Sequence, residues 1–598
     1  MGKQSARWRP LAALLAVLPI LLSCSPSSRE GGGAVKNPDT YTRLTISDFD
    51  SLDPAWMYDS QSRLVILNVY EHLFGFRGES VEALEPLVAS EVPSVENGLI
   101  SSDGLIYTIP IRDGLTFHDG SPLTADDVKY SLMRFMLQDR SGGPSPLLLE
   151  PILGYTSTRD EQGSPMNRAF RDADQRIRVE ENRVVIELPK PYAPFLSILT
   201  NWAPILAKAW CAANGEWDGT EVTWANYNNP QKQDAYLFDH MNGTGPFMLD
   251  RWDRQNREIQ LVRNDNYWRT PARLQRVIYR GIDEFSTRKL MLTAGDADSI
   301  AATRAQLSQL RGTPGIEIID DLSAIEMTPV LYFTFQVNTS ANPYVGSGSL
   351  DGGGIPPDFF SDPDVRKGFA YSMDYAGFIE DFHLGKGTQA RGVIPRALPG
   401  YDPNVSYYTH DLEKARSHFQ RAWEGKVWEN GFQFTIIYNE GNPERQTICQ
   451  ILKAGVEALN PKFKIDVRPI QWSTYLDAMT GSKLPMFAGG WGADYPDAYN
   501  FLFPFLHSKG HYPVLQGYQN PEIDKLIEQS VAELDLEKRR GLYRRILELA
   551  HEDVPQLVIV DRPTIRVQRS WVSGFAHHPV LNDPFGESPA YTLYKEAP

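Results

Sequence analysis

The sequence predicts a protein of mixed strands and helices, of the α/β or α+β class, with two or more domains. Its 598 residues are too many for a single hydrophobic core. Hydrophobic residues make up 42% of the chain and aromatic residues 11%, which is typical of globular rather than disordered proteins. Segments with helical and strand periodicity follow one another along the chain, as in domains built from packed layers of both types.

Two segments have the three- to four-residue spacing of apolar side chains that indicates an amphipathic helix. In the first, Thr124 precedes Asp127 in the manner of a capping box, and an apolar face follows over residues 128–136. In the second, Asn520 and Pro521 have the form of an N-cap and a first-turn proline, and an apolar stripe follows. We expect a helix to begin at each of these caps.

Three segments alternate apolar and polar side chains with a period of two, which indicates half-buried strands. They are residues 258–262, 432–438 and 463–468. A glycine-rich stretch at 346–354 lacks the lysine and the serine or threonine that follow in a phosphate-binding loop. We therefore expect that stretch to be a surface loop.

The first 23 residues predict a secretory signal peptide. Lys3, Arg7 and Arg9 form a basic start without an acidic residue, and a mainly apolar stretch follows as far as Leu22. That stretch is shorter than the ~20 apolar residues that span a bilayer. We therefore expect residues 1–23 to be removed and the mature body to be soluble and to lie outside the cytoplasm.

The residues after the leader predict a lipid anchor. The sequence Leu-Leu-Ser-Cys, which ends at Cys24, resembles a bacterial lipobox, whose cysteine is diacylated and becomes the mature N-terminus. Residues 24–37 are rich in serine and glycine, a composition typical of a flexible tether. A lipid on Cys24 would hold the body at the bacterial cell membrane, in the periplasm or on the cell surface. The alternative is an ordinary secreted protein in which Cys24 has no such role.

The charge and the cysteines exclude several classes of protein. The formal net charge is −16, whereas nucleic-acid binding depends on basic patches, so we expect no nucleic-acid partner. Cationic or zwitterionic ligands are compatible with this charge. Besides Cys24 the chain has Cys211 and Cys449, which do not form a disulfide framework or a zinc site. A single disulfide between them and two buried thiols fit the sequence equally well.

The usual catalytic signatures are absent from the sequence. It has no G-x-S-x-G, no H-E-x-x-H, no phosphate-binding loop and no dinucleotide-binding glycine fingerprint. His577 and His578 are adjacent and have no evident third ligand nearby, so a structural role is favoured over a metal site. We therefore expect a protein that is not an enzyme, with no catalytic residue, no cofactor and no metal.

Five segments, in order along the chain, carry a resemblance to a known family. The most specific is LTFHDGSPLTADDV at 115–128, a loop that leads into the first predicted helix. The others are SLDP at 51–54 with NVYEHLF at 68–74, GTGPF at 243–247 with RNDNYW at 263–268, DPDVR at 362–366 with AYSMD at 370–374, and WGADYPD at 491–497. Together they resemble family 5 of the bacterial extracellular solute-binding proteins, the oligopeptide-, dipeptide- and nickel-binding proteins of ABC importers.

The resemblance implies a two-lobed α/β fold of the periplasmic-binding-protein kind, with an additional subdomain on the first lobe and a hinge between the lobes. The chain would start in lobe I, cross to lobe II and return to lobe I at its C-terminus. The implied parts are lobe I at 38–325, which includes the subdomain at about 76–235, lobe II at 326–561, the C-terminal return at 562–598, and hinge crossings near 327–338 and 558–566.

The resemblance also implies a function. Members capture a ligand between the lobes and release it to a membrane permease that is driven by an ATPase on a separate chain. For this chain we expect short peptides as the ligand and a monomer that is attached to the membrane through its N-terminal lipid. Some members bind a sugar, haem or a nickel chelate, and such a ligand is the alternative. An extracytoplasmic hydrolase or a structural lipoprotein is less favoured.

Asp494 is the residue that the resemblance assigns most directly to the ligand. In peptide-binding members an aspartate in this segment pairs with the free α-amino group of the ligand. A carboxylate stabilises an enclosed ammonium through a charge-assisted hydrogen bond. The alternative is that Asp494 caps a turn before Pro496. Asp497 is a weaker candidate for the same role, and a helix cap is the favoured alternative for it.

Backbone groups are implied to bind the rest of the ligand. Members pair an extended peptide with strand-like main chain on both lobes, and glycines allow the backbone to approach a ligand closely. Trp491 would wall the cavity, with a position in the core as the alternative. The expected ligand-binding residues are Ser60, Gln61, Gly490, Trp491, Gly492, Asp494 and Tyr495.

One position departs from the family pattern. In some oligopeptide binders an arginine three positions before this tryptophan meets the C-terminal carboxylate of the ligand. Here that position is Ala488. A different cation must then serve the carboxylate, and the sequence does not identify it.

Overall fold

The computed structural model describes residues 35–46 and 48–597. The predicted signal peptide, Cys24 and most of the predicted tether lie outside these residues. Within the described part of the chain, no helix is long and apolar enough to cross a membrane.

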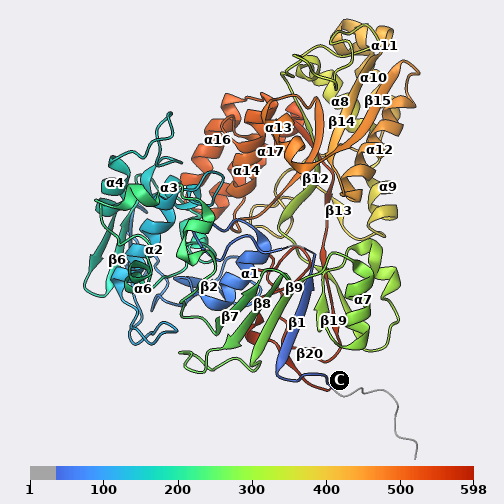
Figure 1. Cartoon of the computed structure of the whole chain (residues 1–598). Helices are drawn as coiled ribbons and strands as arrows, with labels where there is room; N and C mark the ends of the chain where they lie inside the picture. Colours follow the sequence, from blue (N-terminus) through green and yellow to red (C-terminus); the bar gives the residue numbers. More distant parts are fainter. Residues whose placement is uncertain (1–34, 47, 598) are drawn as a thin grey trace, which may run out of the picture.

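Lobe I is built on a seven-stranded mixed sheet, in the lower half of Figure 1. β1 lies at its centre and pairs in parallel with β9 and β10, and β19, from near the C-terminus, lies between β10 and β11. The predicted strand at 258–262 is confirmed as β8. In spatial order the strands are β11 (Ile316–Leu322), β19 (Thr564–Arg569), β10 (Ser299–Ile300), β1 (Thr40–Thr45), β9 (Arg276–Gly281), β8 (Glu258–Arg263) and β7 (Phe247–Asp253).

Lobe II is built on a five-stranded sheet with its own aromatic core. The other two predicted strands are confirmed as β14 and β15, which pair in parallel. The core contains Phe359, Phe369 and Phe432, and α8 (Pro363–Ser372), α10 (Leu412–Arg421) and α12 (Pro443–Glu457) contribute to it. In spatial order the strands are β15 (Phe463–Ile470), β14 (Phe432–Asn439), β16 (Met486–Gly492), β12 (Glu326–Phe333) and β17 (Gln556–Val558).

A smaller unit within residues 76–235 projects from lobe I, on the left of Figure 1. Its sheet has the order β4 (Ile106–Pro110), β6 (Arg183–Glu187) and β5 (Ile177–Glu180), and α2 (Ala125–Gln138), α3 (Pro146–Leu153) and α4 (Arg168–Arg176) pack together beside it. The predicted capping box is confirmed, since Asp127 Oδ2 accepts hydrogen bonds from the backbone N and the Oγ1 of Thr124 at 2.9 and 2.7 Å.

A buried group of charges ties α2 to the N-terminal segment. Arg134 donates two hydrogen bonds to Asp53, at 2.8 and 2.7 Å, and one to Glu216 at 2.7 Å. All three side chains are buried. Two parallel N–H···O bonds fix both distance and angle, so this bidentate pair sets the position of the SLDP segment on the subdomain.

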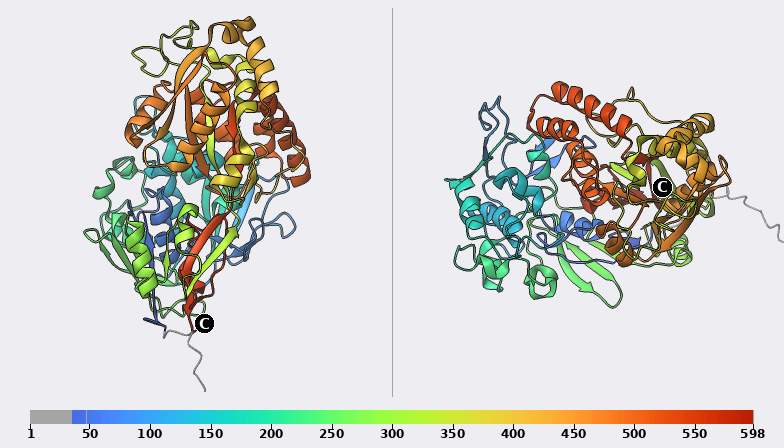
Figure 2. Two further views of the ribbon diagram at one scale, coloured as in Figure 1. Left: turned by 90° about the vertical axis from the view of Figure 1, so that its right-hand side faces the viewer. Right: turned by 90° about the horizontal axis from the view of Figure 1, so that it is seen from above.

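Two short chain segments connect the large sheets. The first is residues 323–325, between β11 and β12, and the second is residues 559–563, between β17 and β19, which includes β18 (Val560–Asp561). The sequence analysis placed the first crossing at residues 327–338. The crossing lies earlier in the chain, because β12 is already paired with β16 and β17 inside lobe II. The left view of Figure 2 shows the two lobes one above the other.

The helices just before β17 in the chain lie between the subdomain and the lobe II sheet, where α14, α16 and α17 are labelled in Figure 1. The Tyr499 hydroxyl donates to Glu150 of the subdomain at 2.8 Å, and the Ala193 N–H donates to the Val531 carbonyl at 2.9 Å. The lobes are therefore in direct contact here. The helices are α14 (Tyr499–Leu506), α15 (His511–Gln516), α16 (Pro521–Ala532), which confirms the second predicted helix, and α17 (Leu536–Asp553).

The structure decides between the two alternatives for the cysteines. Cys211 lies in α6 (Lys208–Ala213) of the subdomain, and Cys449 lies in α12 of lobe II. Both are buried free thiols. Burial raises the pKa of the Cys211 thiol to about 12, so it is protonated at neutral pH.

Candidate functional site

A cavity of about 260 Å³ lies where the two lobes meet. Its walls come from the start of α1 (Ser60–Val69), from the first crossing, from the chain after β16 and from the C-terminal return. These segments are far apart in the sequence, so only the folded chain forms the cavity. The lining residues fall within 58–63, 323–326, 492–494 and 577–584, with Trp202 and Thr564 in addition.

Asp494 follows β16 and lines this cavity. The residue is 9% exposed, and Oδ2 accepts hydrogen bonds from the Tyr58 hydroxyl and from Asn500 Nδ2, each at 3.2 Å. Asn500 Oδ1 also accepts a hydrogen bond from the Asp494 backbone N at 2.9 Å. Asn500 therefore holds both the backbone and the carboxylate, and these contacts orient the side chain.

The backbone of Asp494 is held from the opposite lobe. Its carbonyl oxygen accepts hydrogen bonds from Asn201 Nδ2 at 3.1 Å and from Trp202 Nε1 at 2.8 Å. The Trp202 ring meets the Tyr58 ring edge to face, with 5.5 Å between centroids. Lobe I therefore fixes the segment that carries the carboxylate, and Asp494 is both a cavity residue and an inter-lobe contact.

The Asp494 carboxylate is buried, and in the described part of the chain its hydrogen-bond donors are neutral groups. Burial raises its pKa to about 6, although the hydrogen bonds from Asn500 and Tyr58 and the charge of Arg63 act in the opposite direction. Among the ion pairs of residues 35–46 and 48–597, none includes Asp494. Because enclosing an ionised carboxylate without a cation is unfavourable, an ammonium group that entered the cavity would be stabilised there.

Arg63 supplies a cation to the same cavity, and the sequence reasoning missed it. It lies in α1, and Nη2 donates to the Val580 carbonyl at 3.1 Å. Burial lowers the pKa of Arg63, while the charges of Asp494 and Asp59 favour its protonated form. The sequence could have identified Arg63, because a residue three positions after Ser60 lies on the same face of the helix.

The two predicted residues at the start of α1 have different environments. Ser60 lines the cavity beside Asp59, whose Oδ1 caps the helix by accepting from the backbone N of Gln61 and Ser62 at 3.0 and 2.8 Å. The Gln61 side chain is buried and does not line the cavity. Its Nε2 donates instead to Asp583 at 3.1 Å.

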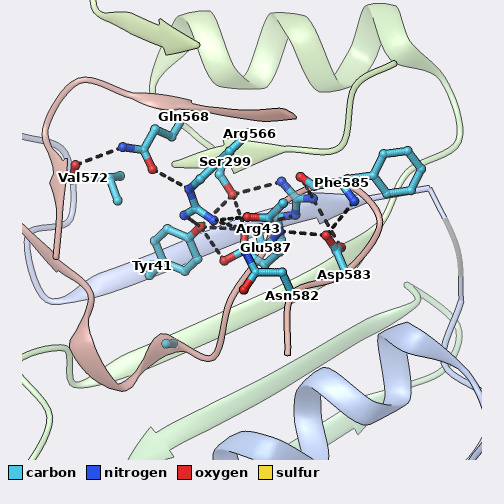
Figure 3. A network of polar contacts seen from close by, with 12 residues as sticks. Tyr41, Arg43, Ser299, Arg566, Gln568, Val572, Asn582, Asp583, Phe585 and Glu587 are labelled. Atoms are coloured by element: carbon cyan, nitrogen blue, oxygen red, sulfur yellow. Dashed lines mark hydrogen bonds and ion pairs between the residues drawn. The ribbon is translucent and has the colours of Figure 1, made fainter. Parts of the chain in front are cut away.

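Asp583 connects the cavity wall to a buried network of charges between β1, β10, β19 and the C-terminal return (Figure 3). Arg43 Nη2 lies 3.4 Å from Asp583 Oδ2, and Arg43 Nε lies 3.3 Å from Glu587. Arg566 lies 3.1 Å from Glu587, which also accepts a hydrogen bond from the Tyr41 hydroxyl at 2.9 Å. Two arginines face two carboxylates, so this network is neutral as a whole and anchors the wall to the sheet.

Three more of the predicted residues do not line the cavity. Tyr495 is buried, and the half-buried Trp491 ring packs against Tyr512, with 6.2 Å between centroids. A Cβ on Gly490 would lie 2.5 Å from the Cβ of Thr328, so close packing between β16 and β12 explains that glycine. The predicted residues that the structure brings together around the cavity are Ser60, Gly492 and Asp494.

The weaker candidates also have structural partners. Asp497 accepts two hydrogen bonds from the buried Arg539, at 2.6 and 2.7 Å, so its charge is already compensated. His577 Nε2 lies 2.7 Å from the Ser323 carbonyl, whereas His578 Nε2 lies 3.2 Å from the Ser80 carbonyl. The two imidazoles thus face different partners, and no group of three candidate metal ligands occurs in the described part of the chain.

Comparison with known proteins agrees with this architecture. A family model described as bacterial extracellular solute-binding proteins, family 5 Middle, matches residues 83–513. The chain belongs to this family. It is accordingly a solute-binding protein of the ABC-importer type and not an enzyme, and members of the family are extracytoplasmic.

Individual relatives match this chain over nearly its whole length. The probable D,D-dipeptide-binding periplasmic protein DdpA of Escherichia coli is 24% identical, with 98% of each chain covered. Heme-binding protein A of Haemophilus influenzae is also 24% identical, over 96% of this chain and 97% of its own. The periplasmic binding protein DppA of Helicobacter pylori, solved with the peptide STSA, is 22% identical with a TM-score of 0.68, over 93% of this chain and 98% of its own. The two-lobed α/β fold is therefore shared.

Proposed function

We propose that this family-5 protein is the substrate-binding lipoprotein of an ABC importer and captures short peptides in the cavity between its lobes. The observation that carries the proposal is the buried Asp494 carboxylate, which lines the cavity and, among the described residues, accepts hydrogen bonds from neutral donors alone. A free α-amino group is the cation that every unmodified peptide provides. The names of the E. coli and H. pylori relatives support the same ligand class.

The two ends of the ligand would meet opposite charges. In our proposal Asp494 binds the α-ammonium group and Arg63 binds the C-terminal carboxylate. Arg63 would thus take the role of the arginine that some oligopeptide binders have at the position of Ala488. Ala488 itself is buried in β16, where its carbonyl accepts a hydrogen bond from Tyr475 at 2.8 Å. The cavity of about 260 Å³ lies below the ~300–1,000 Å³ of pockets for drug-sized ligands, which favours a ligand of two or three residues.

The importer role extends the proposal to the membrane. We propose that a lipid on Cys24 holds the monomer at the membrane outside the cytoplasm, where it delivers its ligand to a permease. Replacement of Cys24 by alanine should then leave the protein in the soluble or unprocessed fraction. Unchanged membrane attachment of Cys24→Ala would contradict the lipoprotein part alone.

The ligand class can be tested on the purified protein. Native mass spectrometry of ligand that co-purifies should find short peptides. Recovery of a sugar, of haem or of a nickel complex in their place would contradict the proposal.

The role of Asp494 needs a separate measurement. Calorimetric titration should show that Asp494→Asn weakens binding of a dipeptide with a free N-terminus by on the order of tenfold or more, because a charged hydrogen bond is lost. The N-acetylated dipeptide should lose far less. Asp477→Asn, at an exposed position of α13 (Trp472–Thr480) outside the cavity, is the matched control. Equal losses for both dipeptides would refute the pairing with the amine.

A further inference from the structure

Lobe I contains a second cavity, which shares a wall with the cavity between the lobes. Its volume is about 340 Å³, which exceeds the 260 Å³ of the first cavity. His577 and Asn582 line both cavities, so a single segment of the C-terminal return separates them. The other walls include parts of α1, β2 (Phe74–Phe76) and β3 (Leu84–Pro86), and the described lining residues all belong to lobe I. We call this second space the lobe I cavity.

Two buried polar side chains of this lining lack a hydrogen-bond partner. His72, just after α1, and Ser588, in the C-terminal return, are each 3% exposed. Neither His72 Nε2 nor Ser588 Oγ has a partner among residues 35–46 and 48–597. The Tyr70 hydroxyl has none there either, but it lies near the buried charges around α2. Because an unpaired buried polar group is unfavourable, two such atoms beside one cavity indicate that a molecule in the cavity pairs with them.

The charged side chains of the same lining have partners within the protein. Glu71 accepts hydrogen bonds from the Tyr267 hydroxyl at 2.8 Å and from Trp268 Nε1 at 2.8 and 2.9 Å. Arg269 lies 3.3 Å from Glu85. The groups that call for a ligand are therefore the neutral ones.

The chemistry of the unpartnered groups indicates the kind of ligand. Burial lowers the pKa of His72 to about 3, so its imidazole is neutral at pH 7. A hydroxyl group both donates and accepts, so it can pair with Nε2 whichever ring nitrogen carries the proton, and it can pair with Ser588 Oγ in the same way. The rest of the lining is mostly apolar, with side chains from Leu67, Phe76, Leu87, Leu581 and Tyr591.

We propose that the lobe I cavity binds a small neutral molecule with an apolar body, of about the size of one aromatic ring, and a hydroxyl group that pairs with His72 and Ser588. The cavity volume lies within the ~300–1,000 Å³ of pockets for small molecules. All described lining residues belong to lobe I, so this binding does not require the lobes to close. The proposal is independent of the ligand that the cavity between the lobes takes.

A pair of ligands that differ only in the hydroxyl group tests the proposal. p-Cresol has this group, and toluene has the same apolar body without it. Ligand-observed NMR titration of the purified protein at pH 7 measures both affinities. We expect p-cresol to bind on the order of tenfold more tightly, because toluene leaves the two buried groups unpaired.

Substitutions that remove the polar atoms locate the binding. Ser588→Ala and His72→Phe change the shape of the lining little, and each should weaken p-cresol binding by about three- to tenfold without weakening toluene binding. The double variant should have no preference for p-cresol. Ser530→Ala is the matched control, because the buried Ser530 hydroxyl donates to the Ile527 carbonyl at 2.8 Å and lies outside this lining. It should leave both affinities unchanged, and thermal unfolding verifies that each variant is folded.

The outcomes separate this proposal from the proposed function. If neither p-cresol nor toluene binds, the cavity holds water only and the proposal is overturned. Equal affinities for the two ligands, or a preference for p-cresol that persists in Ser588→Ala at its full size, would overturn the pairing with the hydroxyl group. Asp494 does not line the lobe I cavity, so each of these results leaves the proposed peptide binding standing.

Discussion

The raised pKa of Asp494 predicts that peptide binding weakens in mild acid. The carboxylate form is the one that pairs with an ammonium group, and burial brings its pKa to about 6. A proton therefore competes with the ligand as the pH falls through that value. The ligand amine does not confound the experiment, since an α-amino group has a pKa of about 7.7–8.0 and stays protonated at lower pH.

The size of the effect follows from the ionised fraction of Asp494. For a pKa of about 6, Asp494 is ionised in about ten of eleven molecules at pH 7 and in about one of eleven at pH 5. The affinity for a dipeptide should therefore fall about tenfold from pH 7 to pH 5, which corresponds to about 1.4 kcal/mol. Nearby charges do not change this direction, because Arg63 stays protonated, and desolvation of the phenol and the charge of Asp494 raise the pKa of Tyr58, which stays neutral.

Isothermal titration calorimetry at pH 7, 6 and 5 measures the effect, and titrations in two buffers of different ionisation enthalpy count the protons released on binding. Asp494→Asn should bind more weakly and lose most of the pH dependence. An affinity that is constant from pH 7 to pH 5, or a pH dependence that persists unchanged in Asp494→Asn, would refute the reasoning.

Unfolding of the protein in mild acid is not expected to be the cause of the weaker binding. Asp494 has a higher pKa in the folded protein than its ordinary value of 3.8, so the folded state binds the proton more tightly than the unfolded state does. The contribution of Asp494 to the stability of the ligand-free protein therefore increases as the pH falls from about 6 towards 4. Thermal unfolding at the same pH values separates this effect on stability from the opposite effect on binding.

Three further predictions concern stability, and urea or thermal unfolding measures each. Arg134→Ala leaves two buried carboxylates without a cation and should destabilise the protein by about 3–5 kcal/mol; an effect below about 1 kcal/mol would contradict the buried triad. Gly243→Ala places a Cβ 2.0 Å from the Val69 carbonyl oxygen, so we expect the free energy of unfolding to fall by about 1–3 kcal/mol. An unchanged free energy of unfolding would contradict this close approach. Because Cys211 and Cys449 are free thiols, a reductant should leave the unfolding midpoint unchanged; a midpoint that falls on reduction would indicate a disulfide and contradict this assignment.

Local patterns in the sequence were sufficient for several elements. The caps at Thr124 and Asn520 begin α2 and α16, and the three alternating segments are β8, β14 and β15. Each of these depends on side chains within a few residues of one another, where backbone geometry and periodicity decide the outcome. The order of the motifs along the chain extended the prediction to the family and its two-lobed fold.

The site could be predicted only in part. Asp494, Ser60 and Gly492 line the cavity, whereas Gln61 turns to Asp583 and Gly490 packs on β12. Neighbouring residues in one segment point to opposite faces, and the sequence does not say which face meets the ligand.

The sequence by itself determined the fold class, the family and a carboxylate at position 494, because those depend on local patterns and on their order. The tertiary structure decided that Asp494 forms no ion pair with another described residue, that Arg63 and Asp59 share its cavity, and that the two cysteines lie in different lobes. The physical reason is that burial and charge pairing depend on contacts between segments hundreds of residues apart. Only the folded chain brings the start of α1, the end of β16 and the C-terminal return to one place.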